Sequence, residues 1–171
     1  MRKLIFLFVL LSFSSAFGQI NNDKLIAPAE GKSVIYFMRT SGLGALMNFR
    51  YFDESNYLGK FNGVNYLRYE CEPGKHLFWI LAENTDVLEA NLAANKIYIV
   101  ETNATMGAFS AAARFKLVDY KNNSQIKRIN KLLNKKDAKQ FTEEELKKAK
   151  DKMFSAYSKR YEKSCQQNQK R

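Results

Sequence analysis

The chain has 171 residues, of which 28 are Lys or Arg and 17 are Asp or Glu, so its formal net charge is +11. A hydrophobic fraction of 46% and an aromatic fraction of 13% exclude a wholly disordered chain. The two cysteines are too few for a disulfide-rich miniprotein. The charge is uneven: residues 19–121 hold 11 basic and 11 acidic side chains, whereas residues 122–171 hold 15 basic and six acidic ones. A neutral body therefore precedes a basic tail.

The first 18 residues have the three-part pattern of a secretory signal peptide. Two basic residues precede an unbroken apolar run over residues 4–11, and Ala16 and Gly18 are the small residues that a signal peptidase requires. The run is about half the ~20 residues that span a bilayer, which favours cleavage over an uncleaved N-terminal anchor. We expect a mature chain that begins at Gln19 and is periplasmic or secreted, without a transmembrane segment.

Export changes the expected partners of the basic tail. An exported protein does not normally meet genomic DNA, so a nucleic-acid partner is not expected. Anionic lipid head groups, wall polymers and acidic proteins become the expected partners of a basic surface.

Short apolar or alternating runs separated by turn residues fill the body of the chain, a rhythm typical of a β-sandwich. The expected strands cover about residues 34–38, 49–52, 57–61, 64–71, 76–81, 88–92, 96–101 and 111–118. Asn62-Gly63 suits a two-residue hairpin turn, and Pro73-Gly74 suits a second tight turn. We therefore predict a mainly β fold, a small antiparallel β-sandwich that is immunoglobulin-like or similar.

Ordered motifs lie along these expected strands. They are Val34-Ile35-Tyr36-Phe37 with Arg39, Ser41 and Gly42; Tyr57-Leu58-Gly59-Lys60; Tyr69 with Pro73, Gly74 and His76; Tyr98 with Val100; Met106-Gly107; and Ala113-Arg114-Phe115 with Leu117. Over residues 25–119 the chain resembles a bacterial domain of unknown function, the family numbered 2846. The resemblance implies an exported β-domain, often lipoprotein-like, with no established activity.

Three features depart from that family pattern. No lipidation cysteine follows the cleavage region, Glu54-Ser55-Asn56 stands where relatives have an Asp-Gly turn, and Asn95 stands where a glycine is usual. The tail lies outside the resemblance. The expected organisation is a signal peptide over residues 1–18, a lead-in over 19–32, a β-sandwich over 33–121 and a helical tail over 122–171.

The tail is predicted to form two helices. The first has one apolar stripe, made of Ile126, Ile129, Leu132 and Leu133. The second begins at a capping box between Thr142 and Glu145, flanked by the hydrophobic staple of Phe141 and Leu146. Its stripe continues through Leu146, Ala149, Met153, Phe154, Tyr157 and Tyr161. We expect the second helix to dock on the body, the alternative being a peripheral contact with an anionic membrane surface.

The residues that carry most enzyme chemistry are sparse. His76 is the single histidine, no cluster of His, Cys or carboxylates has the spacing of a metal site, and no Gly-x-Ser-x-Gly motif occurs. Glu70 and Glu72 are close in sequence, but glycosidase carboxylates face each other across a cleft. The sequence predicts no catalytic, cofactor-binding or metal-ligating residue, and a protein that is not an enzyme.

Two tentative sites remain. Tyr51, Tyr66 and Tyr69 are candidates for a glycan-stacking surface, although aromatic side chains on strands are more often part of a core. Cys71 and Cys165 are candidates for a disulfide in an oxidising compartment, but the position of Cys165 beyond the strongest helix pattern favours the alternative of two free thiols.

These observations favour an exported, non-enzymatic β-sandwich protein that binds or scaffolds a component of the bacterial envelope. The alternative is a glycan- or lipid-binding module that uses exposed aromatics, with the basic helix contacting anionic envelope surfaces. Neither interpretation requires a cofactor.

Overall fold

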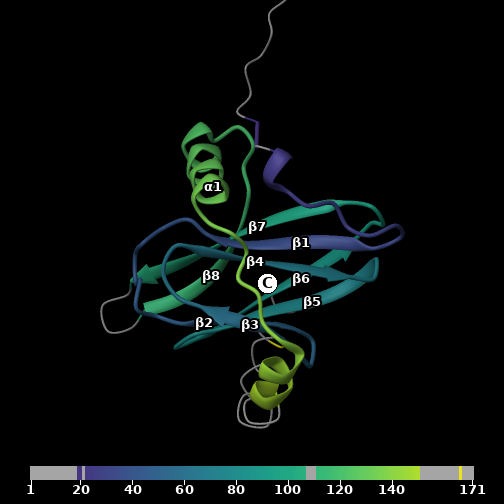
Figure 1. Cartoon of the computed structure of the whole chain (residues 1–171). Helices are drawn as coiled ribbons and strands as arrows, with labels where there is room; N and C mark the ends of the chain where they lie inside the picture. The colour runs from purple at the N-terminus through teal and green to yellow at the C-terminus, as the bar shows by residue number, and fades with distance from the viewer. Residues whose placement is uncertain (1–18, 21, 107–110, 151–165, 167–171) are drawn as a thin grey trace, which may run out of the picture.

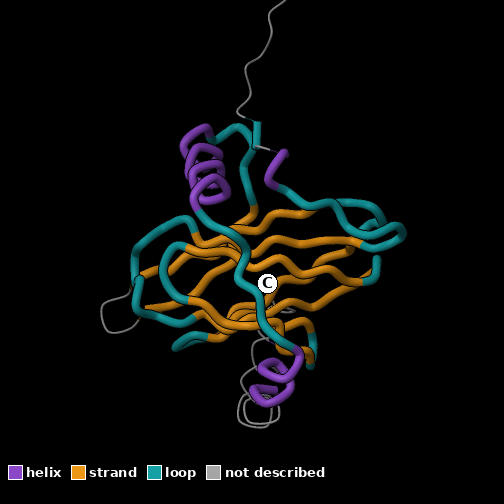
Figure 2. Tube along the Cα trace, in the orientation of Figure 1, coloured by secondary structure: helices purple, strands orange, loops and turns teal. Residues whose placement is uncertain are grey.

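The structure, a computed structural model, describes residues 19–20, 22–106, 111–150 and 166. Its elements, in chain order, are the 3₁₀-helix η1 (Asn22–Lys24), β1 (Ser33–Arg39), β2 (Phe49–Asp53), β3 (Asn56–Phe61), β4 (Asn65–Cys71), β5 (Gly74–Leu81), β6 (Thr85–Leu92), β7 (Ile97–Met106), β8 (Ala111–Leu117) and α1 (Asn123–Lys135). The strands form two layers with helices on their outer sides (Figures 1 and 2). The predicted mainly β fold is confirmed, and each expected strand is present.

The two sheets have four strands each. Sheet I has the order β4-β1-β7-β8 and sheet II the order β3-β2-β5-β6. Strands β1 and β7 pair in parallel, and the other pairs in both sheets are antiparallel. In immunoglobulin domains the first two strands are neighbours in one sheet, whereas here β1 and β2 lie in different sheets.

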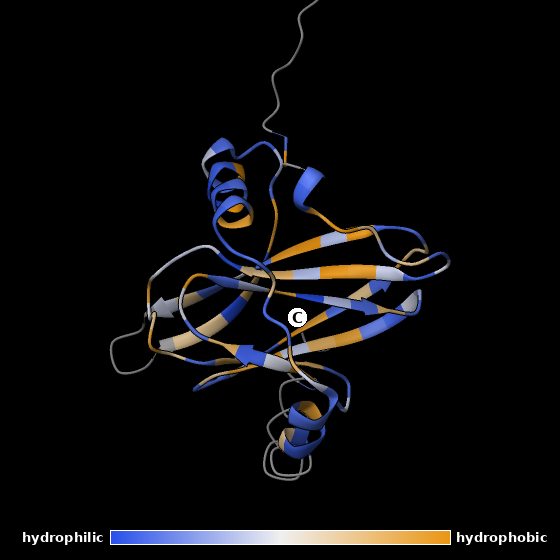
Figure 3. Cartoon of the chain, in the orientation of Figure 1, coloured by the Kyte–Doolittle hydropathy of each residue, from blue (hydrophilic) through white to orange (hydrophobic). Residues whose placement is uncertain are grey.

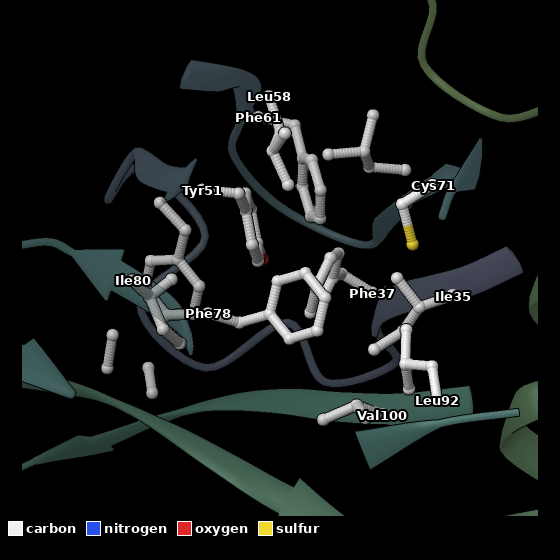
Figure 4. Close-up of a cluster of buried hydrophobic side chains, with 14 residues drawn as sticks. Ile35, Phe37, Tyr51, Leu58, Phe61, Cys71, Phe78, Ile80, Leu92 and Val100 are labelled. Carbon is white, nitrogen blue, oxygen red and sulfur yellow. The ribbon is translucent and has the colours of Figure 1, made fainter. Parts of the chain in front are cut away.

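Alternation along β1 explains why its sequence is an unbroken apolar run. Ile35 and Phe37 point into the core between the sheets, while Val34, Tyr36 and Met38 point to the outer side of sheet I and are also buried. Figure 4 shows the inner cluster, where side chains from both sheets interdigitate.

Helix α1 covers the outer face of sheet I. Its side chains Ile126, Ile129, Leu132 and Leu133 are buried against Val34, Tyr36, Met38 and Tyr66. The side chain of Asn122 caps the helix by accepting a hydrogen bond of 3.1 Å from the Gln125 amide. The ribbon of α1 is mainly hydrophilic with short hydrophobic stretches (Figure 3), as expected for a helix with one docked stripe.

The second tail helix lies on the opposite side of the sandwich, against sheet II (Figure 1). It begins at residue 143 and is described as far as residue 150. The capping box is present: the Glu145 amide donates to Thr142 Oγ1 at 3.2 Å, and the Thr142 amide donates to Glu145 Oε2 at 2.8 Å. Leu146 and Ala149 pack against a buried group that contains Trp79. The rest of the stripe, from Met153 to Tyr161, lies outside the described residues.

The described part of the tail is therefore docked on the body. Residues 136–141 connect the two helices by crossing the edge formed by β4 and β3, and we call this segment the strap. The Lys139 amide donates to the Tyr66 carbonyl of β4 at 2.8 Å, and the Phe141 ring covers Gly59 of β3. The strap thus protects an edge that would otherwise offer free backbone groups.

The other open edge is capped by side chains. Asn84 bonds both the amide and the carbonyl of Ala113 on β8, at 2.6 and 2.9 Å. Asp86 of β6 accepts from the Phe115 amide at 2.8 Å and from Arg114 at 2.8 Å. These bonds link the two sheets and occupy backbone groups of the edge strand β8.

Both positions that depart from the family pattern at a turn have a left-handed backbone. Glu54 has a φ of 47° and Asn95 a φ of 60°, a region that favours glycine. The Asn95 side chain compensates by accepting from the Gly31 amide at 2.8 Å. Glu54 is held by its own backbone, because its carbonyl accepts from the buried Trp79 indole at 2.8 Å and its amide donates to Leu77.

The predicted signal peptide falls on residues 1–18, outside the described residues. Within the part of the chain that the structure covers, no helix combines the length and the apolar character needed to cross a membrane.

Candidate functional site

The inward-facing positions of the sandwich become polar at one end. On β2, Asp53 continues the inward series of Phe49 and Tyr51, and on β5 His76 precedes the inward Phe78. Tyr69 and Cys71 end the inward series of β4. We call the group Asp53, Tyr69, Cys71 and His76 the polar mouth. It lines a cavity of about 580 Å³ whose rim also contains Lys32, Glu54, Asn56, Glu70, Glu72 and Lys75.

One buried carboxylate organises the polar mouth. Asp53 is 5% exposed, and its Oδ2 lies 2.8 Å from His76 Nδ1 and accepts a hydrogen bond of 3.2 Å from the Tyr69 hydroxyl. Tyr69 and His76 are also the two ends of the family-like motif around Pro73-Gly74, so the turn at this dipeptide folds both ends onto the same carboxylate.

Both ring nitrogens of His76 are engaged. Nε2 donates to the Glu72 carbonyl at 2.8 Å, because a carbonyl oxygen can only accept. Nδ1 faces Asp53 Oδ2 at 2.8 Å, so the carboxylate engages the second ring nitrogen. The ring also stacks on Phe78 at 5.3 Å between centroids, with an interplanar angle of 6°. His76 is thus fixed in orientation and has no nitrogen free to accept a proton from a substrate.

The remaining acceptor of Asp53 is unsatisfied. Its Oδ1 atom is buried and has no hydrogen-bond partner among the described residues. Tyr69 remains a neutral donor, because burial and the neighbouring Asp53 carboxylate raise the pKa of its phenol. A buried acceptor without a donor costs about 1–3 kcal/mol, so the surrounding packing and the two bonds to Oδ2 hold the Asp53 carboxylate in place against that cost.

The rim is made of opposed charges. Lys32 pairs with Glu72, and Arg68 pairs with Glu70 at 2.7 Å. The hydrogen bond from Arg68, together with that from the Ala29 amide, lowers the pKa of the Glu70 carboxyl. Glu54 and Lys75 add one acidic and one basic side chain to the lining, so acidic and basic groups alternate around the cavity.

Cys71 does not supply an activated nucleophile. Among the described residues it has no disulfide partner and is buried, and its side chain belongs to the inner cluster (Figure 4). Burial, and secondarily the charge of Asp53, raise the pKa of the thiol to about 11, whereas reactive cysteines have lowered pKa values. Cys165 lies outside the described residues, so its bond to Cys71 stays a prediction.

A thiol-labelling experiment tests this environment. In a reduced and folded Cys165→Ser variant, we expect Cys71 to react at pH 8 at about one hundredth of the rate of a thiol with the reference pKa of 9.0, because a shift of two pKa units lowers the thiolate fraction about 100-fold. The rate should rise about tenfold per pH unit up to pH 10, followed with Ellman's reagent. Equal rates in the folded and the urea-unfolded variant would contradict this description. Labelling the unreduced wild type in urea also reports on the predicted disulfide, since a bridge leaves no thiol to label.

Only one of the three candidate tyrosines is available to a ligand. Tyr51 is 0% exposed and its hydroxyl lies 2.8 Å from Thr102 Oγ1. Tyr66 lies on the outer face of sheet I, where α1 covers it, and its hydroxyl donates to the Lys136 carbonyl at 3.2 Å. Both rings are part of the packing, as is more usual for aromatic side chains on strands, so they are not available for the candidate glycan-stacking surface. Tyr69 lies at the polar mouth.

Asp53 is the candidate site residue that the sequence interpretation missed. The signal was present, because Phe49, Tyr51 and Asp53 occupy alternate positions and so share one face of a strand. Its partners were not visible, since His76 reaches it through the pairing of β2 with β5. No group of three or more potential metal ligands occurs among the described residues.

Comparisons with known proteins add no assignment. No protein-family model matches the chain, and a search of curated proteins finds no match. The likeness to the family numbered 2846 therefore rests on the sequence motifs alone.

Proposed function

We propose that this chain is an exported, non-enzymatic β-sandwich protein of the bacterial envelope, and that it binds an envelope component through the polar mouth. The observation that carries the proposal is the hydrogen-bond network on Asp53. It holds His76 and Tyr69 in fixed positions around a cavity and leaves one buried acceptor, Oδ1, without a partner.

The same network argues for binding rather than catalysis. A general base needs a free acceptor within hydrogen-bond reach of the proton that it removes, and both nitrogens of His76 are engaged. A cysteine nucleophile needs a thiolate, and the raised pKa of Cys71 keeps the thiol protonated at neutral pH. Export is supported by the signal-peptide pattern of the first 18 residues and by the family resemblance.

A glycan is the second candidate, because the cavity is lined mainly by polar side chains, two of which, Lys32 and Glu72, already form an ion pair. A neutral, hydroxyl-rich ligand can hydrogen-bond to the polar side chains of this lining without adding charge, whereas a lipid tail would bury polar groups without partners. In this form of the proposal a single tyrosine, Tyr69, supplies the aromatic contact.

Affinity capture tests the proposal. The chain from Gln19, immobilised and incubated with a solubilised envelope extract, should retain a component that the Asp53→Asn variant loses. This substitution keeps the size of the side chain but removes the charge that holds His76. The matched control is Glu144→Gln, which removes one exposed carboxylate from the second tail helix.

Two readouts separate the parts of the proposal. The retained component should have the same mass before and after incubation, and a changed mass would show catalysis. In the producing cell, N-terminal sequencing should find Gln19 as the first residue of the exported form, whereas an unprocessed cytoplasmic chain would overturn the assignment to the envelope. Retention by Asp53→Asn at the wild-type level would exclude the polar mouth as the binding site.

A further inference from the structure

The solvent face of α1 is the most one-sided charged surface among the described elements. The helix has four basic residues, Lys127, Arg128, Lys131 and Lys135, and no acidic one. Lys127, Lys131 and Lys135 recur every four positions, so they form one row along the helix, and all three are exposed. By contrast, residues 143–150 of the second tail helix contain three acidic and three basic side chains.

The apolar face of α1 is fully used by the body. Ile126, Ile129, Leu132 and Leu133 are each no more than 3% exposed, so the helix cannot insert an apolar face into a bilayer as a free amphipathic helix does. Its position is fixed further by Gln125, which donates to the buried Glu101 at 2.6 Å. The basic row is therefore presented on a rigid support, and any contact that it makes is electrostatic.

The chain enters the body on the same side. The Asn130 side chain of α1 donates to the Gln19 carbonyl at 2.9 Å, and Ile20 is buried in the cluster that α1 forms with sheet I. Gln19 is the residue that directly follows the predicted signal peptide. Until the predicted signal peptide is removed, the chain therefore joins the apolar run of residues 4–11 from the face of the body that carries α1, and this face is the one that first meets the membrane.

The basic row and the position of Gln19 beside α1 support one proposal. We propose that the solvent face of α1 binds anionic lipid head groups and orients the body with sheet I toward the membrane. The proposal rests on the envelope location given above, but it uses a surface separate from the polar mouth. Each basic residue near an anionic membrane contributes about 1 kcal/mol. Arg128 is directed to Glu101 and Thr40 of the body, so the row of three lysines makes the contact, which is reversible and salt-sensitive rather than a permanent anchor.

Vesicle co-sedimentation tests this proposal on the chain from Gln19. We expect binding to vesicles that contain phosphatidylglycerol, no binding to pure phosphatidylcholine, and loss of binding near 1 M salt, where the screening length falls to about 3 Å. The triple variant Lys127→Glu, Lys131→Glu, Lys135→Glu should bind at least about 100-fold more weakly, because it removes three favourable contacts of about 1 kcal/mol each.

The control reverses the same number of charges on the other side of the sandwich. Lys60, Lys147 and Lys148 are exposed residues on β3 and the second tail helix, and changing all three to Glu should leave binding within about threefold of the wild type, because charges farther than a screening length of ~10 Å from the lipid contribute little. A milder α1 variant with Gln at residues 127, 131 and 135 should lose an intermediate amount, and it serves if the Glu variant does not fold.

Three results would overturn the proposal: wild-type protein that ignores phosphatidylglycerol, an α1 variant that binds as the wild type does, or a control variant that loses as much as the α1 variant. Soluble polyphosphate is the competing probe. Wild-type protein that binds polyphosphate but not vesicles would reassign the basic row to a soluble polyanion. Vesicle binding does not depend on Asp53, so a failure here and a failure of the polar mouth are distinguishable.

Discussion

Replacing Glu101 with alanine is expected to lower the free energy of unfolding by about 3 kcal/mol, because it leaves a buried amide without a partner and opens space in a packed region. Glu101 of β7 is 0% exposed. Its carboxylate accepts from the Thr40 hydroxyl and from Gln125 Nε2, the latter at 2.6 Å. Gln125 is equally buried and its Oε1 accepts from the Asp119 amide at 3.0 Å. The pair thus joins sheet I, the β8–α1 connection and α1.

A double-mutant cycle isolates this link. Urea unfolding of Glu101→Ala, Gln125→Ala and the double variant should give a coupling energy of about 1–3 kcal/mol, since removing both partners leaves neither buried group unpaired. The matched control is Thr105→Ala, which removes an exposed β7 hydroxyl that donates to the Ala112 carbonyl at 3.3 Å and should cost less than about 1 kcal/mol. Additive costs for the two single variants would show that the observed hydrogen bond carries no energy of its own.

Replacing Gly59 with alanine is expected to cost about 3 kcal/mol or more, from a clash in the packed edge of the sandwich together with backbone strain. A Cβ at this position would lie 2.3 Å from Cε2 and 2.5 Å from Cδ2 of Phe141. Gly59 also has a φ of 134°, which L side chains rarely adopt. To accommodate the methyl group, the Phe141 ring must leave its site, and the strap is then released from β3.

Removing the Phe141 ring, with which the new methyl group would clash, provides the control. In a Phe141→Ala background the ring is absent, so Gly59→Ala should cost only the backbone strain of about 1–2 kcal/mol. Chemical unfolding of the two single variants and the double variant measures the difference, and the double variant should be more stable than the sum of the single costs predicts. If Gly59→Ala costs the same in both backgrounds, Phe141 is not the residue that requires glycine here.

The polar mouth shows how much of a site the sequence can reveal. His76 and Tyr69 stood out as a lone histidine and a strand tyrosine, and their spacing around Pro73-Gly74 indicated a tight turn between two strands. Their common partner, Asp53, lies at the end of β2, in a different hairpin. Alternation with Phe49 and Tyr51 indicates its inward face, but nothing in its local sequence shows which residues it meets. It reaches His76 because β2 pairs with β5, placing Asp53 opposite Phe78, a non-local choice that no short window contains.

The aromatic residues of the strands show a second limit of prediction from sequence. Alternation correctly indicates that about half of the side chains of a strand face inward, but it does not say whether the outer face is covered. Tyr66 of β4 points outward and is nevertheless 5% exposed, because α1 and the strap cover that side of the strand. Tyr66 is unavailable to a ligand for this reason and Tyr51 because it faces the core, so neither outcome comes from an error in the strand assignment.

The structure also shows where the basic residues of the tail lie on the fold. The basic excess lies in the tail, as the sequence indicates, and the structure places the four basic residues of α1 on one side of the sandwich, where Gln19 enters the body. The described part of the second tail helix, on the opposite side, is balanced in charge. Among the described residues of the tail, the basic excess therefore lies on the side of the sandwich that carries α1.

Local interactions are the part of this protein that its sequence determines by itself. The eight strands follow from alternation and turn dipeptides, α1 from its stripe, and the start of the second helix from the capping box of Thr142 and Glu145, because each depends on residues within a few positions of one another. Strand order, the docking of the two helices on opposite sheets, the fit of Phe141 on Gly59 and the meeting of Asp53 with His76 were decided by the tertiary structure. Each joins segments distant in sequence, and burial and packing select that pairing among many that local patterns allow equally well.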